Sequence, residues 1–508
     1  MPRILNLKHI NSPFRKNLSI SFISFFVSIG SAFWLTPFII SNLGVEANGY
    51  IGTVTDLLNT ATIITLAITA MSSRYISIEL QRGNIKQANK YFNSIFISIA
   101  TLALGLFILF FVAAQNIDKI IQIDATSIDD VRKLLYIVFA TFLITFLKTP
   151  FLGVLYYRNR LDIIYTFQIV SHIFRVVLSI AVFELYRPMV WVPNLGVLII
   201  EALATLYIVN KNKNLVPELR ISLRDFDIKA IKLIVNSGIW VSISKAGTVM
   251  LSTLNTYLIN IFIGPKQAGI YVSIFLLNSM LVVMVNAIVP SFIPQMFKLY
   301  AQRKIPDLVS YVKRSIVILG VPIGIVVGGI IVFGQSFITL WLGKQFGEYE
   351  LLLIATVIYL PIVLPVELLS QMNITTNNIK TPAIATLIFG AMNLLMIYIF
   401  FTFTSLGIFA IPIAQMVSLS IRAAVFFPIY CAKTVGETAR TFYPSLTSCL
   451  VVAGVTYSVG SLINSLVVPN GWIKLGMSSV MTAVITMAVL FIAFKIYKKR
   501  NMKTEEGA

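Results

Sequence analysis

Charged residues are scarce in this chain of 508 residues. Asp, Glu, Lys and Arg make up 12% of it, whereas a typical soluble domain spends about a quarter of its residues on them. Hydrophobic residues make up 57%. This composition excludes an ordinary soluble domain and indicates an integral membrane protein.

Cysteine and histidine are also scarce, with two residues of each. Cys431 and Cys449 are too few for a disulfide framework, and we expect both to be reduced structural thiols. The sequence contains no metal-ligand spacing, no glycine-rich phosphate loop and no nucleophile elbow. We therefore expect a protein that is not an enzyme and that holds no metal or other cofactor.

Long apolar runs, by contrast, are abundant. A helix needs about 20 apolar residues to cross the bilayer core, whereas a transmembrane β-strand alternates polar and apolar residues over about ten positions. The continuous runs therefore predict an all-α polytopic membrane protein. The 14 predicted spans are residues 18–41, 49–73, 91–114, 133–156, 162–186, 189–209, 234–263, 268–296, 315–341, 350–376, 382–404, 407–428, 445–468 and 471–494.

The basic residues fall mostly in alternate connecting segments. Of the 40 Lys and Arg, 29 lie in one set of segments, seven lie in the opposite set and four lie inside apolar stretches. By the positive-inside rule the richer set is cytoplasmic, which places both termini in the cytoplasm. The net charge of +20 is spread over short loops, so it indicates helix orientation and contact with membrane lipid rather than a nucleic-acid partner.

A polar, charged segment divides the spans into six before it and eight after it. The segments 39–60 and 258–279 resemble each other, with Gly44 and Gly49 matching Gly264 and Gly269. This weak repeat predicts two six-helix lobes of the same orientation. The predicted regions are a cytoplasmic N-terminus at 1–17, an N-lobe at 18–209, a cytoplasmic inter-lobe linker at 210–233, a C-lobe at 234–428, two further spans within 429–494 and a basic cytoplasmic tail at 495–508.

Prolines inside the predicted spans include Pro37, Pro150, Pro290, Pro294, Pro322, Pro361, Pro365 and Pro412. Proline removes an intrahelical hydrogen bond and kinks a helix, and Pro361 and Pro365 are spaced to bend the tenth span twice. Ordinary packing kinks are one interpretation of these prolines. Their concentration favours helices that bend during a transport cycle.

The cations inside apolar stretches are the main functional candidates, because a charge in hydrocarbon is costly. Arg175 shares a polar stripe of the fifth span with Gln168 and His172. It lies roughly 20 Å from the inner end of the helix, too far to reach the interface easily. We expect Arg175 to face an aqueous cavity, with a structural pairing, for example to Glu201, as the alternative. For His172 a hydrogen-bonded neighbour is favoured over a proton carrier.

Three further intramembrane cations have weaker patterns. Lys245 lies on a similar stripe of the seventh span with Ser242, and we expect it to face the N-lobe stripe across a central cleft. The alternative is a buried ion pair. Lys148 could line the cavity or extend to the headgroups. Arg422 lies near the inner end of its span, where extension to the headgroups is favoured over a place in the cavity.

Two acids inside spans are candidates for a coupling cation or proton. Asp56 lies in the second span and Glu367 in the tenth, and either could instead neutralise a cation of the lumen. For Asp56 both roles stay open, and for Glu367 an ion pair is the favoured interpretation. The predicted cavity then holds more positive than negative charge, which attracts an anion. Arg and Lys suit phosphate in particular.

Several short motifs carry a resemblance to a known family. They are Leu35–Ile40 with Leu43, Gly44, Gly49 and Tyr50, then Tyr157–Arg160, Gly238–Trp240 and Pro290–Tyr300. With the 14 spans, the short loops and the arrangement of six, six and two helices, they resemble the Wzx-type polysaccharide flippases. These belong to the multidrug/oligosaccharidyl-lipid/polysaccharide (MOP) exporter superfamily.

The resemblance implies a V-shaped, MATE-like transporter of the bacterial inner (cytoplasmic) membrane that works by alternating access. Its substrate would be an undecaprenyl-pyrophosphate-linked oligosaccharide, the repeat unit of an O-antigen, a capsule or another surface polysaccharide. Lys148, Arg175 and Lys245 match, in character, the cavity cations that meet the pyrophosphate in such proteins. A polysaccharide polymerase and a chain-length regulator are the implied protein partners.

Other functions stay open at this point. A MATE-type cation/drug antiporter would need an acid-dominated pocket in the first lobe. A lipid II flippase usually has several arginines in the first two spans, where Asp56 is the single charge here. A membrane glycosyltransferase or ligase would need a long outer loop or paired acids and arginines at the outer face, and the loops of this chain are too short.

Overall fold

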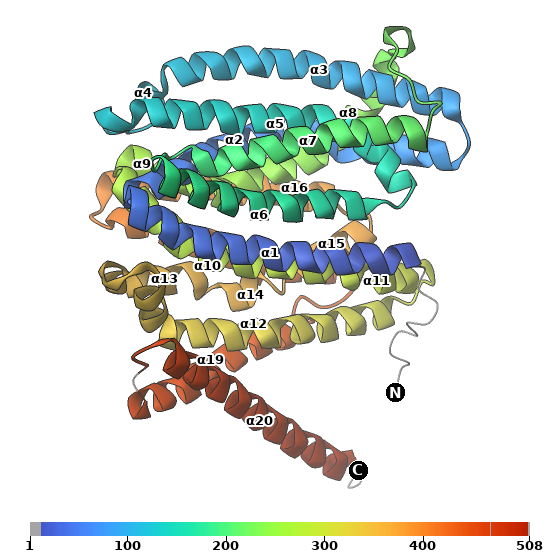
Figure 1. The fold of residues 1–508 in the computed structure, drawn as a ribbon. Helices are drawn as coiled ribbons and strands as arrows, with labels where there is room; N and C mark the ends of the chain where they lie inside the picture. Colours follow the sequence, from blue (N-terminus) through green and yellow to red (C-terminus); the bar gives the residue numbers. More distant parts are fainter. Residues whose placement is uncertain (1–11, 468, 506–508) are drawn as a thin grey trace. The chain divides into compact units, whose positions relative to one another are not determined.

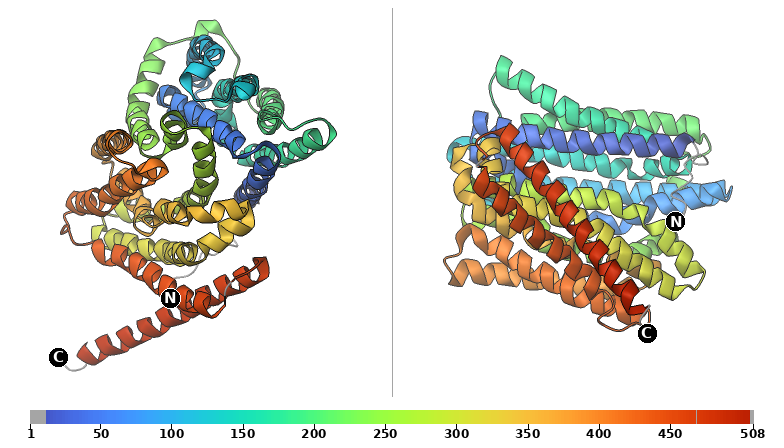
Figure 2. Two further views of the ribbon diagram at one scale, coloured as in Figure 1. Left: turned by 90° about the vertical axis from the view of Figure 1, so that its left-hand side faces the viewer. Right: turned by 90° about the horizontal axis from the view of Figure 1, so that it is seen from below.

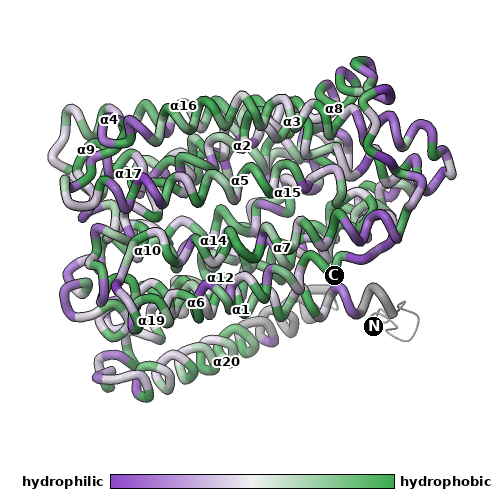
Figure 3. The backbone as a smooth tube through the Cα atoms, turned by 45° about the horizontal axis from the view of Figure 1, so that its top comes forward, coloured by the Kyte–Doolittle hydropathy of each residue, from purple (hydrophilic) through white to green (hydrophobic). Residues whose placement is uncertain are grey.

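The computed structural model describes residues 12–467 and 469–505, and every regular element within them is a helix (Figures 1 and 2). Thirteen helical segments of this described part are long and apolar enough to cross a membrane. Hydrophobic residues dominate the middle of the long helices, and hydrophilic residues gather near their ends (Figure 3). The predicted all-α polytopic class is confirmed, and the protein is a multi-pass membrane protein.

Contacts divide the chain into a first unit, residues 1–272, and a second unit, residues 273–508. The first unit contains α1 (Ser12–Leu43), α2 (Val45–Gln81), α3 (Ile85–Gln115), α4 (Ile117–Ile120), α5 (Ile128–Tyr157), α6 (Leu161–Leu185), α7 (Val192–Leu215), α8 (Ile228–Thr248) and α9 (Asn255–Phe262). Of the predicted N-terminal segment 1–17, residues 1–11 lie outside the described part.

The second unit begins within α10 (Pro265–Ile288). Its other helices are α11 (Ile293–Ala301), α12 (Ile305–Leu342), α13 (Glu350–Val357), α14 (Leu360–Val363), α15 (Glu367–Thr375), α16 (Lys380–Phe403), α17 (Ala410–Ile421), α18 (Phe427–Thr434), α19 (Tyr443–Leu466) and α20 (Trp472–Glu505). Of the predicted tail 495–508, residues 506–508 lie outside the described part.

The core of the first unit lies where α2, α3 and α5 pack together. Ile76, Ile95 and Leu155, one from each helix, are fully buried there. Gly153 of α5 lies directly against Ile76, and a Cβ at this position would come within 3.0 Å of the Ile76 side chain. Small residues permit such close approach of helices in a membrane, where packing rather than the hydrophobic effect drives association.

The seventh predicted span differs from a continuous helix. The helix α8 ends at Thr248, a π-helical turn covers Val249–Thr253, and α9 begins at Asn255. This span is not among the 13 apolar segments of the described chain, because its polar stripe interrupts the hydrophobic run. Gly238 of α8 packs on the backbone of Ala67 in α2, and the contacts group this span with the first unit. The division into two six-helix lobes stays a prediction.

The prolines of the tenth span break it as predicted. The segment between residues 350 and 375 consists of α13, α14 and α15, with Pro361 in the first turn of α14 and Pro365 just before α15. Pro290 likewise separates α10 from α11 through a short 3₁₀ turn. Each proline lacks the backbone N–H that a continuous helix would use.

The last two helices, α19 and α20, belong to the second unit and pack on its helix α12. Gly320, Gly324 and Gly328 are spaced four residues apart on α12, and α19 packs against this ridge at Cys449 and Thr456. Cys449 and Cys431 are both buried and free, as expected for structural thiols. The helix α20 packs on α19 and α12 and then diverges from α19 toward its C-terminal end (Figures 1 and 2).

Candidate functional site

Arg175 lies in α6, which packs between α1 and α7. Gly196 of α7 faces its backbone, and a Cβ at Gly196 would come within 3.0 Å of the Arg175 Cα. The Nε of Arg175 is buried without a hydrogen-bond partner. Among the described residues Arg175 forms no ion pair. Arg175 as a whole is partly buried, and a cation in this state is poorly compensated by the protein itself.

Glu201, the alternative partner that we considered for Arg175, binds another cation. Its Oε1 accepts an ion-pair contact from Lys148 Nζ and a hydrogen bond of 2.7 Å from Thr145 Oγ1. The side chain of Lys148 is only 10% exposed. Lys148 therefore neither extends to the headgroups nor presents a free charge, because Glu201 of α7 neutralises it.

Replacing Lys148 by methionine is expected to destabilise the protein, because the Glu201 carboxylate would lose its counter-ion inside a spanning segment. Removal of one partner of a buried ion pair costs about 3–5 kcal/mol, whereas replacing both by apolar residues is often neutral. The double variant Lys148→Met/Glu201→Leu should therefore regain most of the thermal stability that Lys148→Met loses. The apparent Tm of the purified protein measures this, and equal Tm values for Lys148→Met and the natural protein would contradict it.

The other two residues of the predicted α6 stripe contact α1. Gln168 is exposed and accepts a hydrogen bond of 3.3 Å from Ser24. His172 is partly buried, and its backbone carbonyl accepts a bond of 3.5 Å from Ser31. These residues line the α1–α6 contact one and two turns before Arg175.

Sequence reasoning missed the polar face of α1. Asn17, Ser24 and Ser31 are all buried, and each bonds to α6 or to the turn before it. They are spaced seven residues apart, which puts them on one face of a helix. That spacing is a signal that the sequence does contain.

Lys245 lies in the last turn of α8, directly before the π-helical turn. It is partly buried and forms no ion pair among the described residues. Ser242, one turn earlier, is buried, and its Oγ has no hydrogen-bond partner. Arg175 and Lys245 thus belong to the same contact unit, and neither has a carboxylate partner there.

Asp56 connects α2 to the broken seventh span. Its Oδ2 accepts a hydrogen bond of 2.9 Å from the backbone N–H of Thr256, in the first turn of α9. The π-helical turn leaves the N–H groups at the start of α9 without carbonyl partners, and a carboxylate also suits the positive end of a helix. Asp56 is therefore a helix cap in this structure, with one oxygen already engaged.

A closed contact joins the two segments of the predicted repeat near this cap. Gly49 packs on the backbone of Pro265 and Gly269, and Gly269 packs on the carbonyl of Val45, so neither glycine has room for a Cβ. We call this pair of glycines the glycine contact. It lies at the end of α2 that the charge pattern predicts to face outward.

Reciprocal hydrogen bonds reinforce the same region. The Oδ1 of Asn260 in α9 accepts from Gln122 N at 2.8 Å, and its Nδ2 donates to Gln122 O at 3.2 Å. Gln122 Nε2 also donates to Ile261 O at 2.7 Å. The loop between α4 and α5 is thereby fixed to the C-terminal end of α9.

The candidate residues of the second unit lie near one another at helix breaks. Glu367 begins α15 and accepts a bond of 3.2 Å from Gln371. Arg422 begins a π-helical turn, donates to Thr386 Oγ1 at 3.2 Å and lies 5.2 Å from the ring centre of Phe427. Glu367 and Arg422 interact electrostatically but form no direct ion pair among the described residues. These contacts keep the Arg422 side chain among protein neighbours.

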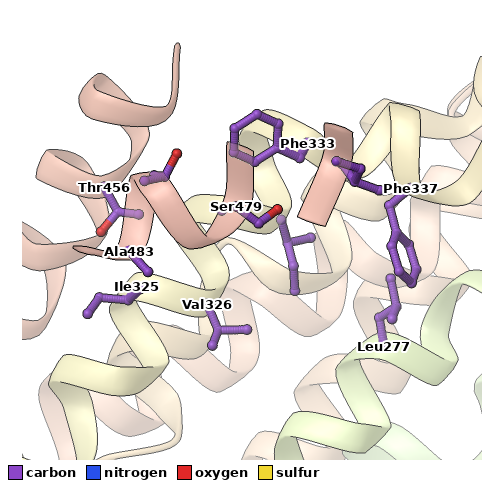
Figure 4. A pocket seen from close by; sticks show the side chains of 13 residues that line it. Leu277, Ile325, Val326, Phe333, Phe337, Thr456, Ser479 and Ala483 are labelled. Atoms are coloured by element: carbon purple, nitrogen blue, oxygen red, sulfur yellow. The ribbon is translucent and has the colours of Figure 1, made fainter. Parts of the chain in front are cut away.

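An apolar cavity of about 290 Å³ lies between α12, α19 and α20 of the second unit. Figure 4 shows Phe333 and Phe337 of α12 and Ala483 of α20 at its wall, with the hydroxyl groups of Ser479 and Thr456. No charged residue lines it. Within the described residues no group of three His, Cys, Asp or Glu could hold a metal ion.

Comparison with known proteins identifies the family. The family model described as "Polysaccharide biosynthesis protein" matches residues 14–300, which is more than half of the chain. The chain belongs to this family. Among curated proteins, it is 26% identical over 462 residues to the "Uncharacterized membrane protein EpsK" of Bacillus subtilis (strain 168), covering 90% of this chain and 91% of EpsK.

Solved structures share the fold of this family member at low sequence identity. The lipid II flippase MurJ, in an inward closed conformation, has a TM-score of 0.72 at 14% identity and covers 94% of this chain and 99% of its own. An inward-facing multidrug resistance MATE family transporter has a TM-score of 0.64 at 16% identity, and the match covers 83% of this chain and 98% of the transporter. The predicted MOP fold and the family resemblance are both confirmed.

Proposed function

We propose that this protein is a flippase that moves an undecaprenyl-pyrophosphate-linked oligosaccharide across the cytoplasmic membrane by alternating access. The observation that carries the proposal is the pair of intramembrane cations, Arg175 and Lys245, that lack a carboxylate partner among the described residues. The substrate is a glycan repeat unit destined for a surface polysaccharide. The protein moves it without covalent chemistry.

An unpaired cation in a membrane-spanning segment is retained when it has a task. The pyrophosphate group supplies the missing negative charge, because a guanidinium binds phosphate oxygens through several N–H groups and an ammonium binds them as a compact charge. Lys148 differs from these two residues because Glu201 already neutralises it. A cationic drug would be repelled by Arg175 and Lys245, which argues against the antiporter alternative.

The lipid part of the substrate needs an apolar surface. The cavity between α12, α19 and α20 offers one, with aromatic walls, no charge and a few hydroxyl groups. We infer that this cavity of the second unit can receive a hydrocarbon chain such as part of a polyprenyl group.

The coupling ion and the partners complete the proposal. Asp56 and Glu367 are the candidate sites for a coupling cation or proton. Binding at Asp56 would compete with its hydrogen bond to Thr256 and so act on the start of α9. We propose that both termini are cytoplasmic and that a polymerase and a chain-length regulator receive the flipped product.

Deletion of the gene tests the proposed substrate class directly. A cell without the flippase is expected to lose its surface polysaccharide and to accumulate the lipid-linked repeat unit on the inner leaflet. Mass spectrometry of the extracted lipid fraction would identify the glycan. A deletion strain that loses the polysaccharide without accumulating any lipid-linked glycan would contradict the proposed step.

A further inference from the structure

Two asparagines of α3 hold the linker that follows α7. Asn89 Nδ2 donates to Glu218 O at 2.9 Å, and its Oδ1 accepts from Arg220 N at 3.0 Å. One turn later, Asn93 Nδ2 donates to Arg220 O at 2.9 Å, and its Oδ1 accepts from Ser222 N at 2.8 Å. Each side-chain amide pairs with the backbone as a neighbouring β-strand would. The linker is therefore fixed in an extended conformation on α3.

A cavity of about 410 Å³ lies under the fixed part of the linker, within the first unit. Phe92 of α3, Phe151 and Val154 of α5 and Val209 of α7 form its apolar walls, and Leu219 of the linker lines it as well. Its volume falls within the range of about 300–1,000 Å³ that is usual for small-molecule sites. The cavity is large enough for part of an amphiphilic molecule.

Two cations, Lys213 and Arg220, line the exposed edge of the cavity. Neither forms an ion pair in the described part of the chain. The bonds to α3 use only the backbone of Arg220, so they leave its guanidinium available. Between residues 211 and 224 the sequence has four cations and one acid, which favours an anionic ligand.

Asn212, which lines the same cavity, has an unpaired acceptor. Its side chain is buried, with the whole residue 7% exposed, and it lines the cavity next to Lys213. Its Nδ2 donates to Phe151 O at 2.7 Å, but its Oδ1 is buried without any partner. Buried acceptors are normally satisfied, so a ligand with a hydroxyl group would complete this site.

The outer surface of the linker is suited to a membrane interface. Ile221 is 57% exposed and Leu223 is 78% exposed, and Arg220 and Arg224 flank them. Apolar side chains mixed with basic ones favour the headgroup level of an anionic leaflet. The charge pattern predicts that this end of the helices faces the cytoplasm.

We propose that this cavity binds one phospholipid of the inner leaflet with an anionic, hydroxyl-bearing headgroup, of which phosphatidylglycerol is the type. Its phosphate lies between Lys213 and Arg220, and a headgroup hydroxyl donates to Asn212 Oδ1. The first part of an acyl chain packs on Phe92 and Phe151. Zwitterionic lipids fit less well, because their own cation would face the two basic side chains. The site is separate from the proposed transport residues and independent of the transported glycan.

Native mass spectrometry of the full chain in detergent tests the site with short-chain lipids. Phosphatidylglycerol is expected to bind at least about tenfold more tightly than phosphatidylcholine with the same chains, a difference of about 1.4 kcal/mol. The variant Lys213→Gln/Arg220→Gln should lose this preference. Arg224→Gln is the matched control, since Arg224 is an exposed cation of the same linker that does not line the cavity, and it should keep the preference.

A second comparison tests the hydroxyl contact. Phosphatidylethanol has the same charge as phosphatidylglycerol but no headgroup hydroxyl. It should bind the natural protein several-fold more weakly than phosphatidylglycerol does. The variant Asn212→Leu should bind the two lipids equally well. Equal binding of phosphatidylglycerol and phosphatidylcholine would overturn the proposal, and so would an equal loss in Arg224→Gln. Displacement of the lipid by millimolar inorganic phosphate would instead assign the site to a soluble anion.

Discussion

Arg175→Ala is expected to abolish the surface polysaccharide while the protein stays in the membrane at its normal level, and Lys245→Ala should do the same. Removing a partly buried cation that has no carboxylate partner relieves an unfavourable charge, so the stability of the folded protein should not decrease. Transport, however, would lose the group that we propose to bind the pyrophosphate. Extracted polysaccharide and an immunoblot of the membrane fraction measure the two quantities, and we expect a loss of polysaccharide of more than about tenfold.

Two further variants make this result specific. Arg175→Lys keeps the charge and should retain part of the export. Arg187→Ala removes an exposed cation just after α6 and should leave export unchanged. Normal polysaccharide in Arg175→Ala would remove Arg175 from the proposed site, whereas a loss of membrane protein in the same variant would make Arg175 a structural residue.

A valine at Gly269 is expected to stop export as completely as loss of Arg175. The carbonyl of Val45 lies where the new side chain would begin, so the glycine contact could not close. Alternating access requires each end of the transport path to close in turn. Polysaccharide export by the variant measures the effect, and Gly49→Val should behave in the same way because Gly49 packs on Gly269.

The matched control for these glycines is Gly105→Val. A Cβ added to Gly105, in the spanning helix α3, would meet no neighbouring atom within 4 Å, so a side chain there extends into open space. This variant should export normally. Normal export by Gly269→Val at normal membrane level would show that the glycine contact is dispensable for transport.

The sequence was sufficient for features that depend on local chemistry. The helix breaks at Pro361 and Pro365 were predicted because proline lacks an N–H wherever it occurs. The spans were predicted because about 20 apolar residues satisfy the bilayer thickness regardless of their neighbours. The family resemblance, based on short motifs and the number of spans, was confirmed by the family model.

The pairing of the buried charges was harder to predict. Glu201 of α7 could have met Arg175 of α6 or Lys148 of α5, because α7 packs on both helices. Hydrophobicity does not fix the rotation of a spanning helix whose faces are nearly all apolar. Only the packed structure shows which cation Glu201 neutralises. Because Glu201 pairs with Lys148, Arg175 has no carboxylate partner among the described residues.

The π-helical turns were also missed. In the seventh span no proline or glycine lies within the turn at 249–253, although Gly247 precedes it by two residues. The polar stripe of this span, with Ser242 and Lys245, predicts a cavity-lining face rather than a turn. In the structure Thr248 and Ser252 donate to the carbonyls four residues earlier, at 3.0 Å and 3.1 Å. Such bonds bend helices, so a hydroxyl-rich stretch can indicate a break as well as a polar face.

The glycine contact has a consequence for the history of the chain. Gly49 and Gly269 occupy matching positions of the predicted repeat, and they touch each other. In an ancestor made of two identical halves, one codon would have encoded both sides of this contact. A mutation to a larger residue would then have changed both sides at once and placed two large side chains against each other. If the predicted repeat arose by duplication and fusion, each side then became free to change alone, yet both positions still hold the smallest residue.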